Sequence, residues 1–129
     1  MKGGAFLNAL NVIEAKLVTE KVNVARANAA RAGFAQFVDI LEGDAMNTLS
    51  TGNETIDLLL LDGWKEIYLP LVKMLTPKFR AGTVVIADKI FTFKTTLRPY
   101  VEHMQNRANG FDSVTLPLSH GMKYSVRIV

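Results

Sequence analysis

The sequence of 129 residues contains no cysteine. This absence excludes disulfides, thiolate metal ligands and thiol catalysis together, and it fits a reducing, cytoplasmic setting. Long apolar runs are also missing, because the two longest, Ile56–Leu61 and Thr83–Ala87, fall far short of the roughly 18 residues that a membrane helix needs. Asn8 and Asn11 interrupt the weakly apolar start, and no small-residue cleavage site follows. We therefore expect neither a membrane span nor a secretory signal.

The sequence has no run of charge of one sign. Its formal net charge is +3, and the basic residues are scattered from Lys2 to Arg127. Nucleic acid is therefore not an expected partner, since nothing resembles a patch that follows phosphates. The hydrophobic share of 49% and the charged share of 21% are ordinary for a globular protein and argue against disorder. The length suits one hydrophobic core, so residues 1–129 are expected to form a single domain.

Strands and helices are expected to alternate, which favours an α/β fold with mostly parallel strands and helices on the faces of the sheet. The aliphatic run Ile56–Leu61 is typical of a central strand buried on both faces. The other predicted strands are Leu10–Ala15, Phe37–Leu41, Thr83–Ala87 and a closing hairpin of Ser113–Leu118 with Met122–Ile128.

Three longer helices are expected, together with a short helical segment that follows the turn at Gly43-Asp44 and ends near the loop of residues 50–54. The first begins with Thr19 as N-cap, carries the stripe Val22, Ala25, Ala29 and Ala32, and ends at Gly33. The second carries Trp64, Tyr68, Leu71, Val72 and Leu75, with Pro70 expected either to bend it or to delay its regular start, and with Pro77 closing it. The third carries Leu97, Val101, Met104 and Ala108 and stops at Gly110.

The last strand alternates strictly between two kinds of residue. The apolar residues Met122, Tyr124, Val126 and Ile128 alternate with the polar residues Lys123, Ser125 and Arg127. Since successive side chains of a strand point to opposite faces, this pattern predicts a buried apolar face and a wet polar one.

Acids follow three of the predicted strands, in Glu42-Gly43-Asp44, Asp62-Gly63-Trp64-Lys65 and Asp88-Lys89. Ligands of open α/β sheets bind beyond the carboxyl ends of the strands, so these positions are the first candidates for a site. Asp62 and Asp88 follow strands that we expect to be neighbours. Two adjacent carboxylates suit a hard divalent cation, and Mg²⁺ is the natural expectation.

Each of these residues also has an ordinary structural explanation. An acid after a strand is often a helix cap or a turn former, and for Asp44 both alternatives stay open. Trp64 alone is more often a core residue, and Lys65 alone is more often a solvated one. Only its position beside two predicted acids suggests that Lys65 orients or deprotonates a substrate. His103 and His120 lack metal-ligand spacing and are read as structural or surface residues.

The segment from Ile56 to Pro70, IDLLLLDGWKEIYLP, resembles the central motif of catechol O-methyltransferase-like enzymes. The resemblance continues through Ala25–Asn28, Glu42–Ala45, Arg80–Asp88 and the hairpin from Leu116 to Val126. It implies a Rossmann-like class I methyltransferase sheet that is N-terminally truncated and ends in an antiparallel hairpin. It also implies that a methyl group passes from S-adenosylmethionine to a hydroxyl of a small molecule, commonly with a divalent cation holding the acceptor oxygens.

The resemblance also implies roles for individual residues. Lys65 would help to deprotonate the acceptor hydroxyl. Asp62 and Asp88 would bind the metal. The cofactor would be bordered by Asp44, Ala45, Asp62, Gly63 and Trp64, with Asp44 and Ala45 beside the adenine.

The sequence departs from the family pattern in two places. The family places a glycine-rich loop after its first strand and an acid on the cofactor ribose after the second. Here Gly3-Gly4 is not followed by a strand and a helix in the required order, and Lys16 takes the position of the acid, with Glu14 and Glu20 out of register. The family also commonly has asparagine or aspartate where this chain has Lys89, whose ammonium would compete with a divalent cation.

Two other functions remain as alternatives. A non-catalytic remnant of the fold would act as a binding or dimerisation module, and the loss of the first strand would expose a hydrophobic edge or face, so self-association into a homodimer or larger homo-oligomer is expected. A receiver domain could use the strand Leu58–Asp62 to present a phosphorylatable aspartate. That function is disfavoured, because the chain has no acidic pair after its first strand and ends in a hairpin rather than a helix.

Overall fold

The computed structural model describes residues 12–16 and 18–129, which divide between Thr51 and Gly52 into two compact units. Gly3-Gly4 and the first two positions of the strand predicted at Leu10–Ala15 lie outside the described residues. Each unit is described by itself. None of the described helices has the length and apolar character that crossing a bilayer requires.

The first unit pairs two short parallel strands with one long helix. β1 (Val12–Lys16) runs parallel to β2 (Val38–Glu42), with Lys16 opposite Glu42. Between them lies α2 (Thr19–Arg31), and after β2 comes the short α3 (Ala45–Thr48). Arg26 of α2 donates a hydrogen bond from Nη2 to the carbonyl of Ile40 at 3.0 Å, which ties the helix to β2.

The predicted end of α2 is correct, whereas its predicted N-cap is wrong. Gly33, with φ of +81°, follows the C-cap and stops the helix as predicted, because glycine adopts this left-handed conformation without strain. Thr19 is not the N-cap. It is the first helical residue, and the N-cap is Val18, which makes no capping hydrogen bond through its side chain.

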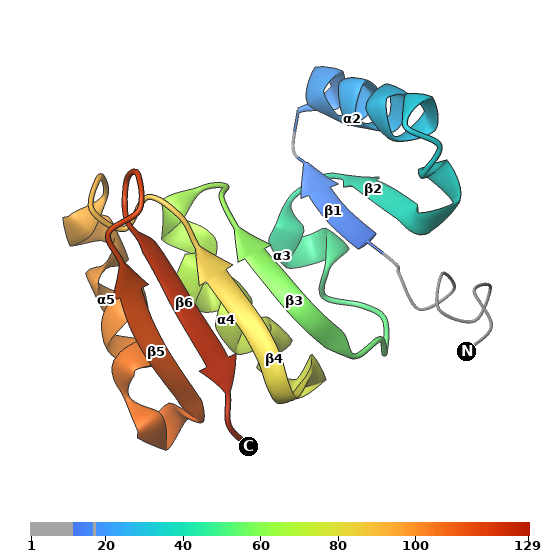
Figure 1. Cartoon of the computed structure of the whole chain (residues 1–129). Coiled ribbons are helices and arrows are strands. Elements are labelled where there is room, and N and C mark those ends of the chain that lie inside the picture. The colour runs from blue at the N-terminus through green and yellow to red at the C-terminus, as the bar shows by residue number, and fades with distance from the viewer. Residues whose placement is uncertain (1–11, 17) are drawn as a thin grey trace. The chain divides into compact units, whose positions relative to one another are not determined.

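The second unit is a four-stranded sheet in the order β3-β4-β6-β5 (Figure 1). β3 (Ile56–Leu61) and β4 (Phe79–Ala87) are parallel, whereas β6 (Met122–Arg127) is antiparallel to both β4 and β5 (Phe111–Leu116). The predicted α/β fold with parallel strands and a closing antiparallel hairpin is therefore confirmed.

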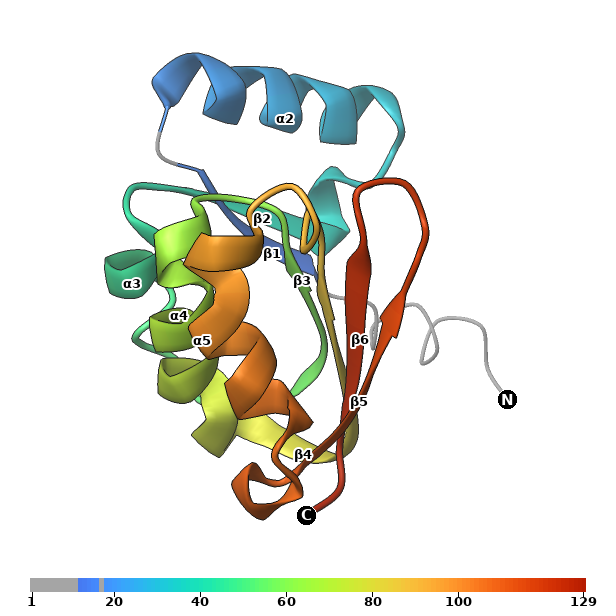
Figure 2. The same cartoon turned by 90° about the vertical axis from the view of Figure 1, so that its left-hand side faces the viewer.

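Helices α4 (Tyr68–Leu75) and α5 (Lys94–Gln105) cover one face of this sheet (Figure 2). Their edge-to-face contact joins the rings of Tyr68 and Tyr100, whose centroids lie 5.8 Å apart. The core of the unit lies between the helices and the sheet, and its large buried side chains include Tyr68, Leu75, Val85, Leu97, Tyr100 and Phe111.

Of the two effects predicted for Pro70, the segment before α4 confirms the delayed start of the helix. A 3-10 turn, Lys65–Ile67, comes first, and the regular helix begins only at Tyr68, which leaves Pro70 in its first turn, where a missing N–H is tolerated. Trp64 precedes this turn and is 68% exposed, so it does not belong to the helix stripe that was predicted to contain it. At the other end of the sequence, Ala108 lies in a 3-10 turn after α5, and Gly110 ends that turn with φ of +89°.

The two faces of the sheet differ from the sequence prediction. Leu58 and Leu60 of β3 are 61% and 62% exposed, so this strand is not buried on both faces. In β6 the predicted faces are exchanged, because Lys123 and Ser125 are 1% and 0% exposed whereas Tyr124 is 37% exposed. The side chains of these two buried residues have polar partners on the neighbouring strand, since Lys123 Nζ donates to Thr115 Oγ1 at 3.0 Å and the hydroxyls of Ser113 and Ser125 lie 2.9 Å apart.

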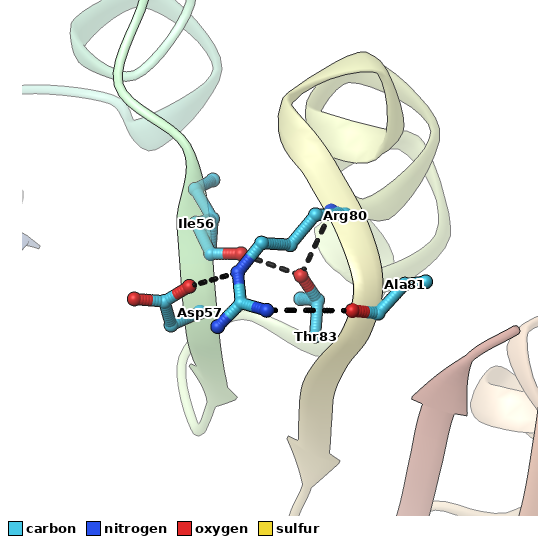
Figure 3. Close-up of polar contacts among 5 residues, drawn as sticks. All are labelled: Ile56, Asp57, Arg80, Ala81 and Thr83. Carbon is cyan, nitrogen blue, oxygen red and sulfur yellow. Dashed lines mark hydrogen bonds and ion pairs between the residues drawn. The ribbon is translucent and has the colours of Figure 1, made fainter. Parts of the chain in front are cut away.

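A hydrogen-bonded bulge fixes the register of β3 on β4 (Figure 3). The pairing jumps from Ile56 opposite Phe79 to Leu58 opposite Val84. Thr83, which is fully buried, bridges the irregular stretch: its Oγ1 donates to the carbonyl of Ile56 at 2.6 Å and accepts from the N–H of Arg80 at 3.0 Å. From this point the strands pair regularly to Leu61 and Ala87 at their carboxyl ends.

Candidate functional site

The carboxyl ends of β3 and β4 lie side by side. Leu61 pairs with Ala87, and the N–H of Asp88 donates to the carbonyl of Leu61 at 3.0 Å. Asp62 and Asp88 are the next residues on the two strands, so the expectation that they follow neighbouring strands is confirmed. Their shared position at one edge of the sheet gives the candidate site its negative charge.

Lys89 brings a positive charge to the same edge. Its Nζ lies 3.5 Å from Asp62 Oδ1, with the two side chains 37% and 52% exposed. Its backbone N–H donates to Asp88 Oδ1 at 2.7 Å. The backbone of Lys89 has φ of +65°, a left-handed conformation that is uncommon outside glycine, asparagine and aspartate.

Tyr68 is a site residue that sequence reasoning missed. Its hydroxyl donates to the backbone carbonyl of Asp88 at 3.3 Å, and the residue is 1% exposed. Burial raises the pKa of Tyr68 well above its ordinary value, and the nearby charges of Asp62 and Asp88 raise it further. The phenol therefore stays protonated at neutral pH and acts as a fixed donor beneath the two acids. The sequence pattern indicated Tyr68 only as one of the apolar residues along one side of a helix.

Lys65 and Trp64 lie on the turn that follows Asp62. Lys65 Nζ donates to the carbonyl of Gly63 at 2.7 Å and lies 5.3 Å from the ring centroids of both Tyr68 and Phe93, within the range of a cation–π contact. The ammonium is thus held by its own turn and by two rings. The indole of Trp64 is largely exposed, which leaves its surface open to a ligand.

The closing hairpin holds the loop that carries Lys89. The N–H of Ile90 donates to the carbonyl of Gly121 at 3.0 Å, and the N–H of Phe91 donates to that of His120 at 2.9 Å. Gly121 has φ of +85°, and a Cβ at this position would lie 2.7 Å from ring carbons of Phe91. No local sequence signal indicated this contact, because the two segments are about 30 residues apart in the chain.

The other predicted cofactor residues belong to the first unit. Asp44 is the N-cap of α3, and its Oδ1 accepts from the N–H of Met46 at 2.9 Å. The capping role that the sequence left open is therefore observed, whereas the predicted contact of Asp44 and Ala45 with a cofactor stays a prediction. A groove of about 670 Å³ in this unit is lined by residues that include Lys16 and Glu20.

The donor set at Asp62 and Asp88 does not suit a divalent cation. Within residues 12–16 and 18–129, no group of three or more histidine, aspartate or glutamate side chains gathers as a metal site would require. The carboxylate of Asp62 has the ammonium of Lys89 beside it instead of a further oxygen ligand. Since Mg²⁺ prefers several oxygen ligands in near-octahedral geometry, the residues present do not fit it.

Comparison with known proteins relates this geometry to one family. The chain is 33% identical over 104 residues to catechol O-methyltransferase B of Danio rerio. The chain is related to the catechol O-methyltransferase-like family. The match covers 71% of this chain and 39% of that methyltransferase, so the chain spans well under half the length of its relative. No family model matches the chain.

Solved methyltransferase structures share the fold. The SAH-bound methyltransferase PaMTH1 of Podospora anserina matches with a TM-score of 0.77 at 19% identity, over 92% of this chain and 61% of that one. The O-methyltransferase of Bacillus cereus in complex with SAH matches with a TM-score of 0.80 at 19% identity, over 91% of this chain and 62% of that one. These matches confirm a methyltransferase fold of which the chain covers about three-fifths.

Proposed function

We propose that the chain functions in S-adenosylmethionine-dependent transfer of a methyl group to a hydroxyl of a small molecule. The observation that carries the proposal is the juxtaposition of Asp62 and Asp88 at one sheet edge, with Trp64 and Lys65 on the adjoining turn. The relationship to catechol O-methyltransferase B supports it, as does the fold shared with methyltransferases solved with SAH. We also propose that both units belong to one methyltransferase domain of a cytoplasmic protein.

The roles of the residues follow from their positions. The cofactor supplies an activated methyl group, so the protein has mainly to hold the two reactants in line. In the second unit we assign the cofactor contacts to Asp62, Gly63 and Trp64; for Asp44 and Ala45 the predicted cofactor contact stays an expectation from the family resemblance. Lys65 is assigned to the acceptor hydroxyl, where a nearby ammonium stabilises the developing oxygen charge and so eases loss of the proton. Mg²⁺ at Asp62 and Asp88 stays a prediction that the donor set does not support.

Titration with S-adenosylmethionine tests the proposal. Trp64 is the single tryptophan of the chain and is largely exposed, so cofactor binding beside it should change the intrinsic fluorescence. Calorimetry on the same samples, with and without Mg²⁺, should show saturable binding. Loss of methyl transfer in Lys65→Gln is expected, with Lys73→Gln on the exposed side of α4 as the matched control. An unchanged fluorescence and no heat would reject the function.

A second candidate function is a non-catalytic module that binds or dimerises. The observation that favours it is an open apolar face on the sheet of the second unit, where Leu60, Ile86, Tyr124 and Val114 pair in register across four strands. Three of these side chains are 37% to 62% exposed. Under this function the chain forms a homo-oligomer, and Leu60→Lys should shift the mass measured by light scattering toward the monomer without any effect of the cofactor.

A further inference from the structure

The carboxyl ends of β3 and β4 contain a positive charge that the chain itself provides. Lys89 contacts both acids, through an ammonium 3.5 Å from Asp62 Oδ1 and through a backbone N–H that donates to Asp88 Oδ1. Two neighbouring carboxylates attract a cation, and here the chain itself supplies one, the ammonium of Lys89. The ion pair of Lys89 and Asp62 is half-exposed, so it adds little to the stability of the fold. Its main effect is to make the site less negative.

The backbone at Lys89 is held in a conformation that suits lysine poorly. Its φ of +65° is adopted several-fold more readily by asparagine and aspartate. The surroundings fix this conformation, because the carbonyl of Lys89 accepts from the N–H of Phe93 at 3.1 Å and the next residue, Ile90, is bonded to Gly121. A strained position that carries an unfavourable residue points to a role for the side chain.

We propose that the ammonium of Lys89 is the built-in cation of this site, which offsets one of the two negative charges of Asp62 and Asp88 and keeps divalent metal ions out. The proposal rests on the proposed methyl transfer and specifies that it runs without a metal. At a separation of about 4 Å in water, the repulsion between a unit charge and a divalent ion is about 3.5 times RT, which weakens metal binding roughly thirtyfold. The partly buried location strengthens this repulsion.

Binding of Mn²⁺ alone, measured by electron paramagnetic resonance of the free ion and without cofactor, tests the proposal on the full chain. Wild type and Lys89→Arg are expected to bind at least tenfold more weakly than Lys89→Gln, which removes the charge and adds no ligand charge. Lys89→Asp is expected to bind most tightly, because it adds a third carboxylate at a backbone position that aspartate tolerates. Thermal melting verifies that each variant is folded.

A second substitution locates the bound metal. Asp62→Asn added to Lys89→Gln should remove the gain in affinity, and a gain that persists would place the ion elsewhere and overturn the proposal. Wild-type binding within threefold of Lys89→Gln would overturn it as well. Failure of the methyl-transfer proposal is seen separately, because it appears as absent cofactor binding in a titration that contains no metal.

Discussion

Thr83→Val tests whether the bulge at the start of β4 sets the pairing of β3 and β4. Valine keeps the shape of threonine and removes only the hydroxyl, whose two hydrogen bonds join Ile56 and Arg80 (Figure 3). The side chain is fully buried, so water cannot replace the hydroxyl in the folded state. Two backbone groups on different strands therefore lose their partner in one substitution.

The expected loss of stability follows from these two bonds. A hydrogen bond contributes about 1 kcal/mol, and a buried group left unpaired costs about 1–3 kcal/mol. Arg80 is exposed, so water can reach its N–H in part, which places the total at about 2–3 kcal/mol. At about 2.1 cal/mol/K of unfolding entropy per residue, a chain of this length should melt about 7–11 °C lower.

Circular dichroism melting with matched variants is the assay. Thr83→Ser keeps both hydrogen bonds and loses one methyl group, so it should cost only about 1 kcal/mol. Asp57→Asn removes the exposed ion pair with Arg80 drawn in the same figure and should cost less than about 0.5 kcal/mol. If Thr83→Val melts with the wild type, or if Thr83→Ser falls as far, the hydroxyl does not hold the register.

Two further substitutions test the buried lysine and the closing turn. Burial lowers the pKa of Lys123 below its ordinary value of about 10.5, so the unfolded chain binds more protons in the pH range between the two pKa values. Wild-type stability should therefore rise as the pH increases toward about 10.5. Lys123→Met should flatten this rise in thermal melting and add about 1 kcal/mol at pH 7. Gly121→Ala forces a side chain onto φ of +85° against Phe91 and should cost about 1–2 kcal/mol in urea unfolding, whereas Gly63→Ala, in open space, should cost little.

The alternation of strands and helices and the position of the acids could be predicted from the sequence. The alternation of elements indicated parallel strands, and the carboxyl ends of parallel neighbours share one edge of a sheet. Asp62 and Asp88 were therefore expected at the same edge, and the pairing of Leu61 with Ala87 confirms it. This part of the site depends only on local patterns and on one rule of topology.

The faces of the sheet could not be assigned in the same way. Alternation in β6 defines two sets of side chains, and hydrophobicity alone placed Tyr124 inside and Lys123 outside. The covered set is the opposite one, since Lys123 and its pairing partner Ala87 are 1% and 0% exposed. Tertiary packing decides which face the helices cover, and the alternation of residues along a strand carries no information about that choice.

The remaining site residues depend on contacts between distant segments. Tyr68 reaches the carbonyl of Asp88 across 20 positions of the chain, and the loop after Asp88 is bonded to the hairpin turn about 30 positions further on. No local pattern encodes either contact. The left-handed backbone of Lys89 is also invisible in the sequence, since lysine is a poor indicator of that conformation.

Two separate structural features determine where the Lys89 ammonium lies relative to Asp62. The bulge at Thr83 sets where β3 ends relative to β4, and hence where Asp62 lies. The hairpin turn at Gly121 sets the loop that carries the ammonium. Gly121→Ala should displace the loop that carries Lys89. It should therefore weaken the exclusion of Mn²⁺, even though every charged group is retained. A Gly121→Ala protein that still excludes Mn²⁺ as the wild type does would mean that charge alone, without the loop geometry, determines the cation of this site.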